Sequence, residues 1–509
     1  MPQSSSGSIE STALGNMKDN GKGRAALGII LALLIGSAII ALVLSIVNWT
    51  SIAGPPGFKY GMVFDAGSSH TSLFVYTWPA DKENDTGIVN QIDVCEAPGG
   101  GISSYANDPP AAGASLRSCL DKAIKLIPEK QQKETPILLG ATAGMRLLRL
   151  QDMVAADKVL DEVSKTMKEY PLNFRGARIL TGNEEGSLGW ITVNYLLKSF
   201  VTCSFAGKWV HPSQGETYGA MDLGGASTQM TFSPKVAITN KSTEAVFKLY
   251  GYNYTVFTHS YLCYGKDQAL KLLLAKLRET QKSSNIDHPC YPTGYTTNIT
   301  LSSLYNSPCL NTTSGDLTAQ ITIKGTGDPT VCQNTIQEIF NFAACGTDCE
   351  FNVYPPPLTG DFYAFSAFYY IFDFLNLTNR ESMSTVRRTI DNFCLQDWNR
   401  LKQRFPTEKE DRLSAYCAAG IYIITLLENK YKFNSETWSN IIFAKQAGNA
   451  DIGWTLGYML NLTNMIPSEA PLEYIGRSRS LWAASLFFIV LSLVAAIILA
   501  LLYLCFQRE

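Results

Sequence analysis

The longest apolar runs of the chain lie near its two ends. Residues 25–47 and 481–506 contain no charged side chain, and each run is long enough to cross a bilayer as a helix. Lys18, Lys22 and Arg24 precede the first run, and basic residues beside a span favour its cytoplasmic side. We therefore expect two transmembrane helices that place both chain ends in the cytoplasm.

The same topology predicts on which side of the membrane each remaining segment lies. Residues 1–24 and 507–509 become cytoplasmic tails, and the Ser- and Gly-rich sequence of residues 1–23 predicts a flexible segment. Everything between the two spans then lies on the exoplasmic side of the membrane.

Between the spans, strand-like runs alternate with helix-like segments. Met62–Trp78 places two β-forming runs on either side of a polar, glycine-containing turn, which predicts a hairpin. Gly219–Phe232 repeats this pattern, and Pro136–Gly140 is typical of a buried strand. This alternation predicts an α/β fold of two related lobes. Helices are predicted at 111–126, 153–170, 189–198, 266–280, 363–375 and 452–460.

Composition and cysteine usage fit a folded exoplasmic domain. The 509 residues allow two or more lobes, and a net charge of −2 without a basic tract gives no reason to expect a nucleic-acid partner. Of the 12 cysteines only Cys505 lies in a predicted span, so an odd number lies where disulfides persist. Residues 283–350 carry five of them and predict a loop-rich insertion tied by disulfides. Glycosylation sequons occur at Asn48, Asn84, Asn240, Asn253, Asn298, Asn311, Asn376 and Asn461.

The two hairpin turns are candidate phosphate-binding loops. Their glycines and backbone N–H groups can form an anion nest, and Asp65 and Asp222 stand beside them where a cation would lie. One such turn is equally well explained as an ordinary β-turn, but the second copy favours two lobes that grip one polyphosphate. Two carboxylates predict a hard divalent cation, Ca²⁺ or Mg²⁺, contacted through water. The predicted phosphate-binding residues are Gly67, Ser68, Ser69, His70, Gly224, Gly225 and Ala226.

Hydrolysis also needs a base that deprotonates water, and several side chains are candidates. Glu184 and Glu185 follow a glycine turn at a helix start, where the helix dipole alone would explain acidic residues. His70 lies in the first loop, although a lone loop histidine is more often a hydrogen-bonding residue. The hydroxyl of Thr142 could orient the water, or it could belong to an ordinary turn.

Five segments together resemble the signature regions of the ectonucleoside triphosphate diphosphohydrolases, the cell-surface apyrases. They occur in that family's order and cover the region between the two predicted spans. Two further segments, His259–Gly265 and Phe362–Ser366, most resemble the type 8 subgroup. The five segments are Asp65–Thr71, Gly140–Arg146, Gly182–Gly186 with Gly189 and Trp190, Met221–Gln229, and Gly453–Asn461.

The resemblance implies a fold and a division of roles. The fold would be two RNase H-like lobes of the actin/Hsp70/sugar-kinase type, flanked by the two transmembrane helices. Lobe I would cover residues 48–181 with 445–478 returning to it, and lobe II would cover residues 182–444. Glu185 would be the general base acting on the attacking water. The other implied roles are Ser227 and Gln229 for holding that water, Asp65, Asp222, Thr142 and Trp454 for ordering the waters of the metal, and Tyr370 and Arg412 for stacking the nucleobase.

One implied residue has an alternative explanation, and one position departs from the family pattern. For Tyr370 the alternative is a core aromatic residue. Asn183 stands where many relatives have Gln, a change that keeps an amide. The implied disulfides leave Cys203 unpaired and are Cys95–Cys119, Cys263–Cys309, Cys290–Cys332, Cys345–Cys349 and Cys394–Cys417.

Together these observations predict a divalent-cation-dependent hydrolase of extracellular nucleoside tri- and diphosphates (ATP, ADP, UTP and UDP) at the plasma membrane. Gly28, Gly36 and Ala41 in the first span could also promote helix association and so a homo-oligomer. Two alternatives stay open: a lumenal nucleoside diphosphatase, and a non-catalytic nucleotide-binding ectodomain.

Overall fold

The computed structural model describes residues 10–46, 50–53, 57–205, 207–212, 216–311, 316–341, 351–448, 450–469, 473–476 and 478–506. The chain forms two compact units, one of residues 1–57 with 469–509 and one of residues 58–468. Three predictions lie outside the described residues: the Cys345–Cys349 disulfide, the Asn48 sequon and the tail 507–509.

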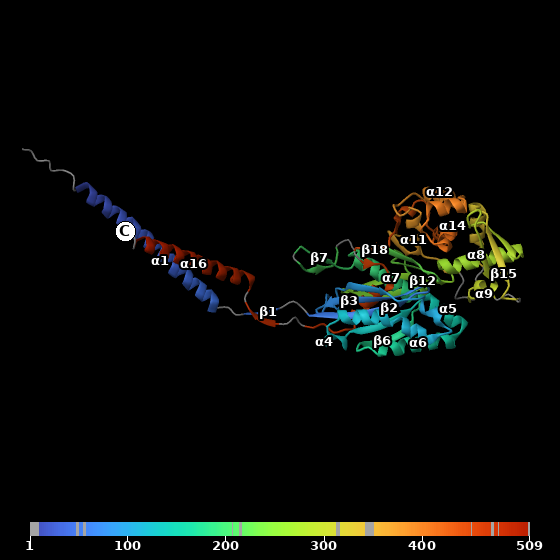
Figure 1. Cartoon of the computed structure of the whole chain (residues 1–509), viewed down its shortest axis with the longest axis horizontal. Helices are drawn as coiled ribbons and strands as arrows, with labels where there is room; N and C mark the ends of the chain where they lie inside the picture. Colours follow the sequence, from blue (N-terminus) through green and yellow to red (C-terminus); the bar gives the residue numbers. More distant parts are fainter. Residues whose placement is uncertain are drawn as a thin grey trace, which may run out of the picture. The chain divides into compact units, whose positions relative to one another are not determined.

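Two long helices that pack against each other dominate the first unit (Figure 1). They are α1 (Glu10–Ile46) and α16 (Arg479–Phe506), and each contains a stretch apolar enough to cross a membrane, Ala25–Ile46 and Arg479–Leu502. The hydroxyls of Ser37 and Ser492 form a 2.7 Å hydrogen bond between the two helices.

The first unit differs from the sequence prediction in two places. Residues 10–23 are helical rather than flexible, because adding residues to an existing helix does not repeat the cost of nucleation. In addition, β1 (Thr50–Ala53) pairs antiparallel with β20 (Glu473–Gly476), which brings together two segments more than 400 residues apart.

Two mixed sheets form the frame of the second unit, and their strands follow the same order. In the first sheet the antiparallel strands β4, β3 and β2 continue into the parallel strands β5 and β6. In the second sheet β12, β10 and β9 continue into β16 and β17 in the same way, and β11 adds an edge strand. This repeat confirms the expected pair of related lobes. The bounds are β2 Phe58–Ala66, β3 Thr71–Pro79, β4 Asn90–Glu96, β5 Pro136–Ala141, β6 Asn173–Ile179, β9 Gly219–Leu223, β10 Ser227–Phe232, β11 Glu244–Leu249, β12 Tyr252–Leu262, β16 Phe362–Ser366 and β17 Ile441–Phe443.

Helices cover both faces of each sheet. In β2, Met62 and Phe64 belong to one core and Val63 to another, which is why the strand is apolar without alternation. Figure 1 shows the cyan helix α6 on the outer side of the first sheet and the orange helices α11, α12 and α14 beyond the second. The outer helices are α2 Pro109–Ser115, α3 Arg117–Ala123 and α6 Met153–Lys168 on the first lobe, and α8 Lys266–Gln281, α10 Pro329–Ile339, α11 Ala367–Phe374, α12 Met383–Cys394, α13 Trp398–Arg404 and α14 Glu410–Thr425 on the second.

Two further helices share a hydrophobic core with residues of both sheets. They are α7 (Gly182–Leu196) and α15 (Trp454–Thr463), which pack against each other. In α7 the residues from Glu185 to Asn194 are all buried, as expected for a helix enclosed on every side. This inner layer connects the two lobes and carries Glu185 and Trp454 between them.

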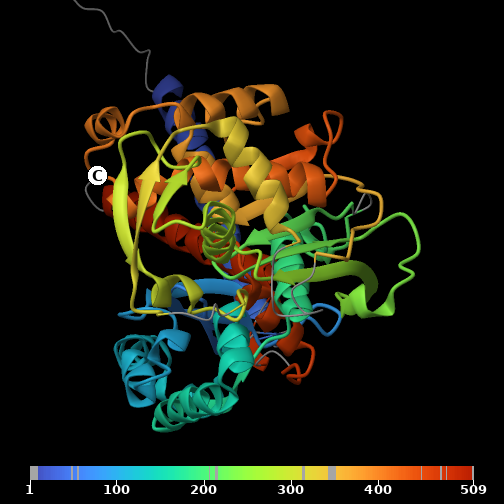
Figure 2. The same cartoon turned by 90° about the vertical axis from the view of Figure 1, so that its right-hand side faces the viewer.

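Four other segments differ from their predictions. The helix predicted at 189–198 already begins at Gly182, where Thr181 and Glu184 form a capping box. The 363–375 run is not one helix, because β16 ends at Ser366 before α11 begins, and an aromatic run alone does not separate strand from helix. The predicted helix at 111–126 is broken near Leu116 into α2 and α3. The cysteine-rich insertion is also more regular than expected (Figure 2). It contains β13 Asn285–His288, β14 Thr296–Thr300, β15 Gln320–Gly325, α9 Leu301–Tyr305 and α10.

Among the described residues of the second unit there are four disulfides, and each is a pair that the family resemblance implies. Two of them fasten the insertion, one links β4 to α3, and one links α12 to α14. Cys203, at the end of the short strand β7 (Thr202–Cys203), is free and exposed. The pairs are Cys95–Cys119, Cys263–Cys309, Cys290–Cys332 and Cys394–Cys417.

The remaining elements are short. They are α4 Glu129–Gln132, α5 Ala143–Gln151, β8 Trp209–Val210, β18 Gln446–Ala447 and β19 Ala450–Asp451.

Candidate active site

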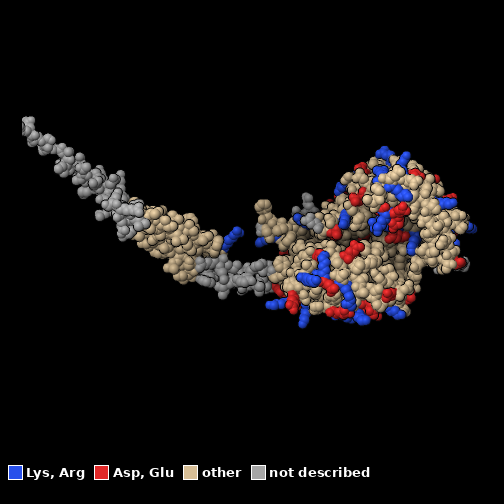
Figure 3. Space-filling view, viewed as in Figure 1, with Lys and Arg blue, Asp and Glu red and all other residues tan. Residues whose placement is uncertain are grey.

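The two glycine loops lie against each other. Residues 67–70 connect β2 to β3, and residues 224–226 connect β9 to β10, so the loops occupy equivalent places in the two lobes. A Cβ atom on Gly225 would lie 2.7 Å from Ser68 Oγ, so the two loops approach each other closely. Figure 3 shows the surface hollowed between the lobes, with charges of both signs interspersed around it.

A third glycine segment, which the sequence analysis did not assign, supports the first loop. A Cβ on Gly101 would lie 2.2 Å from the carbonyl oxygen of Gly67. Glycine at position 101 therefore allows the backbone of residues 99–101 to lie directly against the loop.

Asp65 and Asp222 occupy matching positions at the ends of β2 and β9. Burial raises the pKa of Asp65 to about 7, the indole of Trp454 opposes this, and repulsion from Asp222 adds to it. Burial raises the pKa of Asp222 to about 6, against a stabilising hydrogen bond from the Ser366 hydroxyl. The Oδ1 atoms of both carboxylates are buried and have no hydrogen-bond partner within the described chain. Each carboxylate can therefore accept from a group outside the chain.

Trp454 and Thr142 both lie near Asp65: the Trp454 indole faces its carboxylate, and Thr142 bonds to the next residue, Ala66. A Cβ on Gly140 would lie 2.3 Å from the Trp454 ring, so glycine at the end of β5 admits the indole. The indole Nε1 is buried without a regular hydrogen bond, although it faces Asp65 closely enough to lower its pKa. Thr142 is buried at the N-terminus of α5, and its amide donates to Ala66 O at 3.1 Å.

Glu184 and Glu185 point in different directions from the first turn of α7. Glu184 closes a capping box with Thr181 and forms an ion pair with Arg178 at 2.9 Å. The capping box and the helix dipole are therefore enough to explain an acidic residue at position 184. Glu185 is 9% exposed and points into the interior instead.

Glu185 lies in a network of polar side chains from both lobes. Its Oε2 atom accepts from the Arg146 guanidinium and, at 3.1 Å, from Gln229 Nε2. Gln229 Nε2 also lies 2.6 Å from Ser227 Oγ and 2.9 Å from Ser260 Oγ. Burial raises the pKa of Glu185 to about 8; Arg146 opposes the shift, and Asp222 and Asp65 add to it. A base whose pKa lies near the working pH is suited to proton transfer.

Three residues of this site had no assigned role in the sequence analysis: Arg146, Ser260 and Ser366. Arg146 and Ser260 lie in segments that were singled out for their likeness to a family, but neither has a spacing signal of its own. Ser366 has a positive φ of 56°, a rare conformation for a side-chain-bearing residue and a common one at functional sites. That backbone geometry is visible only in the structure.

His70 and the candidate base-binding residues lie on the periphery. His70 is exposed, and its Nδ1 lies 3.0 Å from Ser69 Oγ. Tyr370 is 54% exposed on α11, which removes the core-aromatic explanation. Arg412 is exposed on α14, and α11 packs against α14, but no contact between the two side chains occurs among the described residues.

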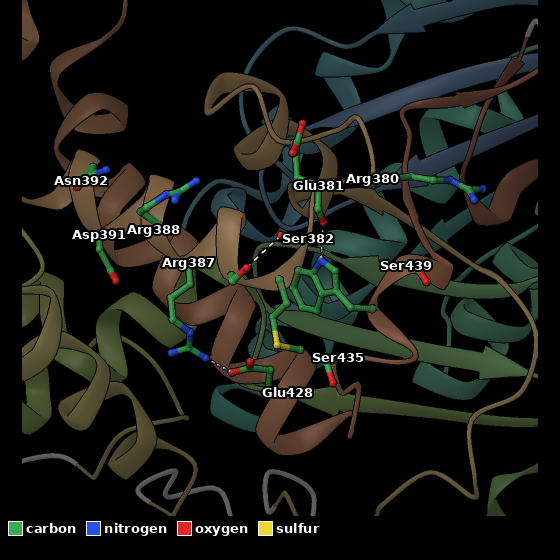
Figure 4. A pocket seen from close by; sticks show the side chains of 13 residues that line it. Arg380, Glu381, Ser382, Arg387, Arg388, Asp391, Asn392, Glu428, Ser435 and Ser439 are labelled. Carbon is green, nitrogen blue, oxygen red and sulfur yellow. Dashed lines mark hydrogen bonds and ion pairs between the residues drawn. The ribbon is translucent and has the colours of Figure 1, made fainter.

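A polar pocket of about 800 Å³ lies elsewhere on the second lobe (Figure 4). It is formed by the start of α12 and the chain that follows α14, and an ion pair between Arg387 and Glu428 crosses its wall. No residue of the glycine loops or of the Glu185 network lines this pocket, so it is not part of the candidate site.

Comparison with known proteins finds a family and several relatives of this chain. The GDA1/CD39 (nucleoside phosphatase) family matches residues 53–475. The ectonucleoside triphosphate diphosphohydrolase 8 of Gallus gallus is 56% identical over 494 residues, which cover 96% of this chain and 99% of the relative. The type 8 enzyme of Homo sapiens is 49% identical, over 93% of this chain and 96% of the relative. The type 2 enzyme of Mus musculus is 44% identical, over 92% of this chain and 95% of the relative. The expected likeness to the type 8 subgroup is therefore confirmed.

A solved structure shares the fold at low sequence identity. The crystal structure of nucleoside triphosphate hydrolases from Neospora caninum superposes with a TM-score of 0.59 at 14% identity, covering 93% of this chain and 100% of that one.

Proposed function

Because the chain belongs to the GDA1/CD39 (nucleoside phosphatase) family, which makes it an apyrase-type hydrolase, we propose that it hydrolyses extracellular nucleoside tri- and diphosphates to the monophosphate and phosphate. ATP, ADP, UTP and UDP are the proposed substrates. The observation that carries the proposal is the position of Glu185: a buried carboxylate in contact with Gln229 and near enough to Asp65 and Asp222, which precede the two glycine loops, for their charges to raise its pKa. Such a group can act as a base at the point where a terminal phosphate would lie.

The proposed reaction is an in-line displacement by water. Glu185 accepts a proton as the water oxygen forms a bond to the terminal phosphorus. The bond from that phosphorus to the bridging oxygen breaks, and the leaving nucleotide keeps the electron pair. Ser227 and Gln229 orient the water, and the N–H groups of the two loops stabilise the charge on the phosphoryl oxygens, which is the main source of catalysis in phosphoryl transfer.

A divalent cation fits the two aspartates. Their buried Oδ1 atoms lack donors, and the waters of a bound ion could supply them. The described residues contain no cluster of three or more His, Cys, Asp or Glu side chains, so direct coordination by a protein cage is not supported. We propose that Asp65 and Asp222, with Thr142 and Trp454, hold Ca²⁺ or Mg²⁺ through water, and that the ion neutralises charge on the polyphosphate.

The proposed location is the plasma membrane, with residues 58–468 outside the cell. Two terminal helices of sufficient length and the disulfides of the second unit support it. The Ser37–Ser492 hydrogen bond supports pairing of the two helices within one chain. A homo-oligomer through the same helices remains a proposal.

Phosphate release from intact cells tests the proposed function. Cells that express the chain should release phosphate from added ATP, ADP and UTP, and a chelator of divalent cations should stop the release. Nucleotides do not cross the membrane, so this turnover must occur outside the cell. Release only from diphosphates and only after permeabilisation would favour the lumenal enzyme, whereas nucleotide binding without release would favour the non-catalytic ectodomain.

A further inference from the structure

Arg146 joins groups from both lobes around the candidate base. Its helix, α5, belongs to the first lobe, whereas Ser227 and Ser260 belong to β10 and β12 of the second sheet. The Nη1 atom donates to Ser260 Oγ at 3.2 Å, and the Nη2 atom donates to Glu185 Oε2 and, at 3.3 Å, to Ser227 Oγ. The side chain is only 14% exposed, so water competes little for these bonds.

The two oxygens of Glu185 differ in their contacts. Oε2 accepts from both Arg146 and Gln229, which fixes its position from two sides. Oε1 accepts no hydrogen bond from any residue that the structure describes. A carboxylate held by one oxygen presents the other in a defined direction.

The chain makes room for this contact at the start of α7. A Cβ on Gly182 would lie 2.2 Å from Ser260 Cβ and 2.5 Å from Arg146 Nη1. Only glycine at that position lets the guanidinium and the serine meet beneath the helix that carries Glu185.

We propose that Arg146, supported by Ser260, is a positioning residue that locks Oε2 of Glu185 and thereby directs Oε1 to the attacking water. This inference rests on the proposed function, in which Glu185 is the base. One O–H bond of water breaks, its proton goes to Oε1, and the remaining oxygen binds phosphorus while the bridging P–O bond breaks. Arg146 stays protonated throughout, since a guanidinium is not deprotonated in proteins. Its contribution is to hold the carboxylate in place, while its charge favours the ionised form of Glu185 that can accept a proton.

Kinetics of three substitutions test this role. Arg146→Ala should lower kcat about 100-fold, the effect of a misplacement of about 1 Å, while KM stays unchanged. The loss should be the same factor for ATP and ADP, because the base acts on water whichever phosphate is terminal. Arg146→Lys should fall between Arg146→Ala and the unaltered protein, since an ammonium keeps the charge and loses the planar fork. Ser260→Ala should lower kcat less than Arg146→Ala.

Chemical rescue separates positioning from general stability. Millimolar guanidinium ions should restore part of the kcat of Arg146→Ala by refilling the vacated site. The matched control is Arg149→Ala on the same helix: that side chain is half exposed, and its ion pair with Asp157 is 4.0 Å long. Arg149→Ala should keep its activity, with or without guanidinium.

Several results would overturn the inference. Normal kcat in Arg146→Ala would do so, as would a loss of kcat that guanidinium does not restore. A rise in KM that differs between ATP and ADP would show that Arg146 holds phosphate instead. If Arg146→Ala does not reach the cell surface, an unchanged kcat in both Arg146→Lys and Ser260→Ala overturns the proposal. An unaltered protein without turnover would refute the proposed function, whereas turnover that depends on Glu185 but not on Arg146 refutes only this inference.

Discussion

Glu184 and Glu185 show how one step along a helix separates two chemical roles. Neighbouring helix residues point about 100° apart, because a turn holds 3.6 residues. Glu184 therefore stays with Arg178 and the capping box, while Glu185 turns into the interior toward Gln229. The helix-start explanation considered for both residues applies to Glu184.

Substitution of each glutamate by glutamine should separate these roles. Glu185→Gln should lower kcat by about 100-fold or more, because an amide cannot take the proton from water. Glu184→Gln is the matched control and should retain activity, since glutamine also completes a capping box. Phosphate release per molecule at the cell surface measures both. Near-normal turnover in Glu185→Gln would contradict its assignment as the base.

Residues that belong to a repeated local pattern could be predicted from the sequence, and residues defined by packing could not. Asp65 and Asp222 stand out because each precedes a glycine turn in one of two similar hairpins. Arg146 lies 39 residues from Glu185 and 114 residues from Ser260 along the chain, so no local spacing connects them. Their meeting depends on how α5, α7 and β12 pack.

At the scale of elements, the boundary between β16 and α11 lies between two parts of the proposed site. The strand ends at Ser366, whose hydroxyl lies close enough to Asp222 to lower its pKa, and the helix that starts there carries the exposed Tyr370. Residues 363–375 are mostly aromatic and apolar, so their pattern did not indicate where the strand ends and the helix begins. One short segment thus links the proposed metal site to the proposed nucleobase site.

Substitutions on α11 and α14 should weaken binding and leave the chemistry unchanged. Tyr370→Ala and Arg412→Ala should each raise KM for ATP and ADP without lowering kcat, because base stacking contributes equally to the ground and transition states. Arg400→Ala, an exposed arginine on the neighbouring helix α13, serves as the control and should change neither constant. A lower kcat at unchanged KM would argue against base stacking by either residue.

At the scale of the whole second unit, three carboxylates of the candidate site carry raised pKa values: Glu185 is buried, and Asp65 and Asp222 are partly buried. The pKa values of Glu185, Asp65 and Asp222 are raised to about 8, 7 and 6, chiefly by burial. In an unfolded chain these groups ionise near pH 4. Because their folded pKa values are higher, their contribution to stability is complete below about pH 4 and is lost as the pH rises through about 6 to 8.

The cation-free protein should therefore lose thermal stability between about pH 5.5 and about pH 8. Ca²⁺ or Mg²⁺ should raise the Tm, and the increase should be larger at the higher pH, where the carboxylates are ionised and bind the ion. Thermal unfolding of the full chain in detergent, with chelator or with added cation, measures this difference. Asp65→Asn should reduce the cation-dependent increase, and an increase independent of pH would exclude these carboxylates as its source.

The two-lobe architecture was predictable because a repeated hairpin reflects a repeated sheet. The regular structure of the insertion was not, because its strands are short and its sequence is dominated by turn-forming residues and cysteines. The pairing of β1 with β20 was not predictable either, since each is a four-residue segment beside a span and neither has a pattern that indicates its partner.

That pairing bears on how the protein could leave a cell. In the proposed topology, each end of the folded unit continues into its own membrane span, and β1 and β20 pair beside those spans. A single cut in either connection would leave the enzyme attached through the other. Release of the folded unit as a soluble form would then require two cuts, so a single cleavage should not free it from the membrane.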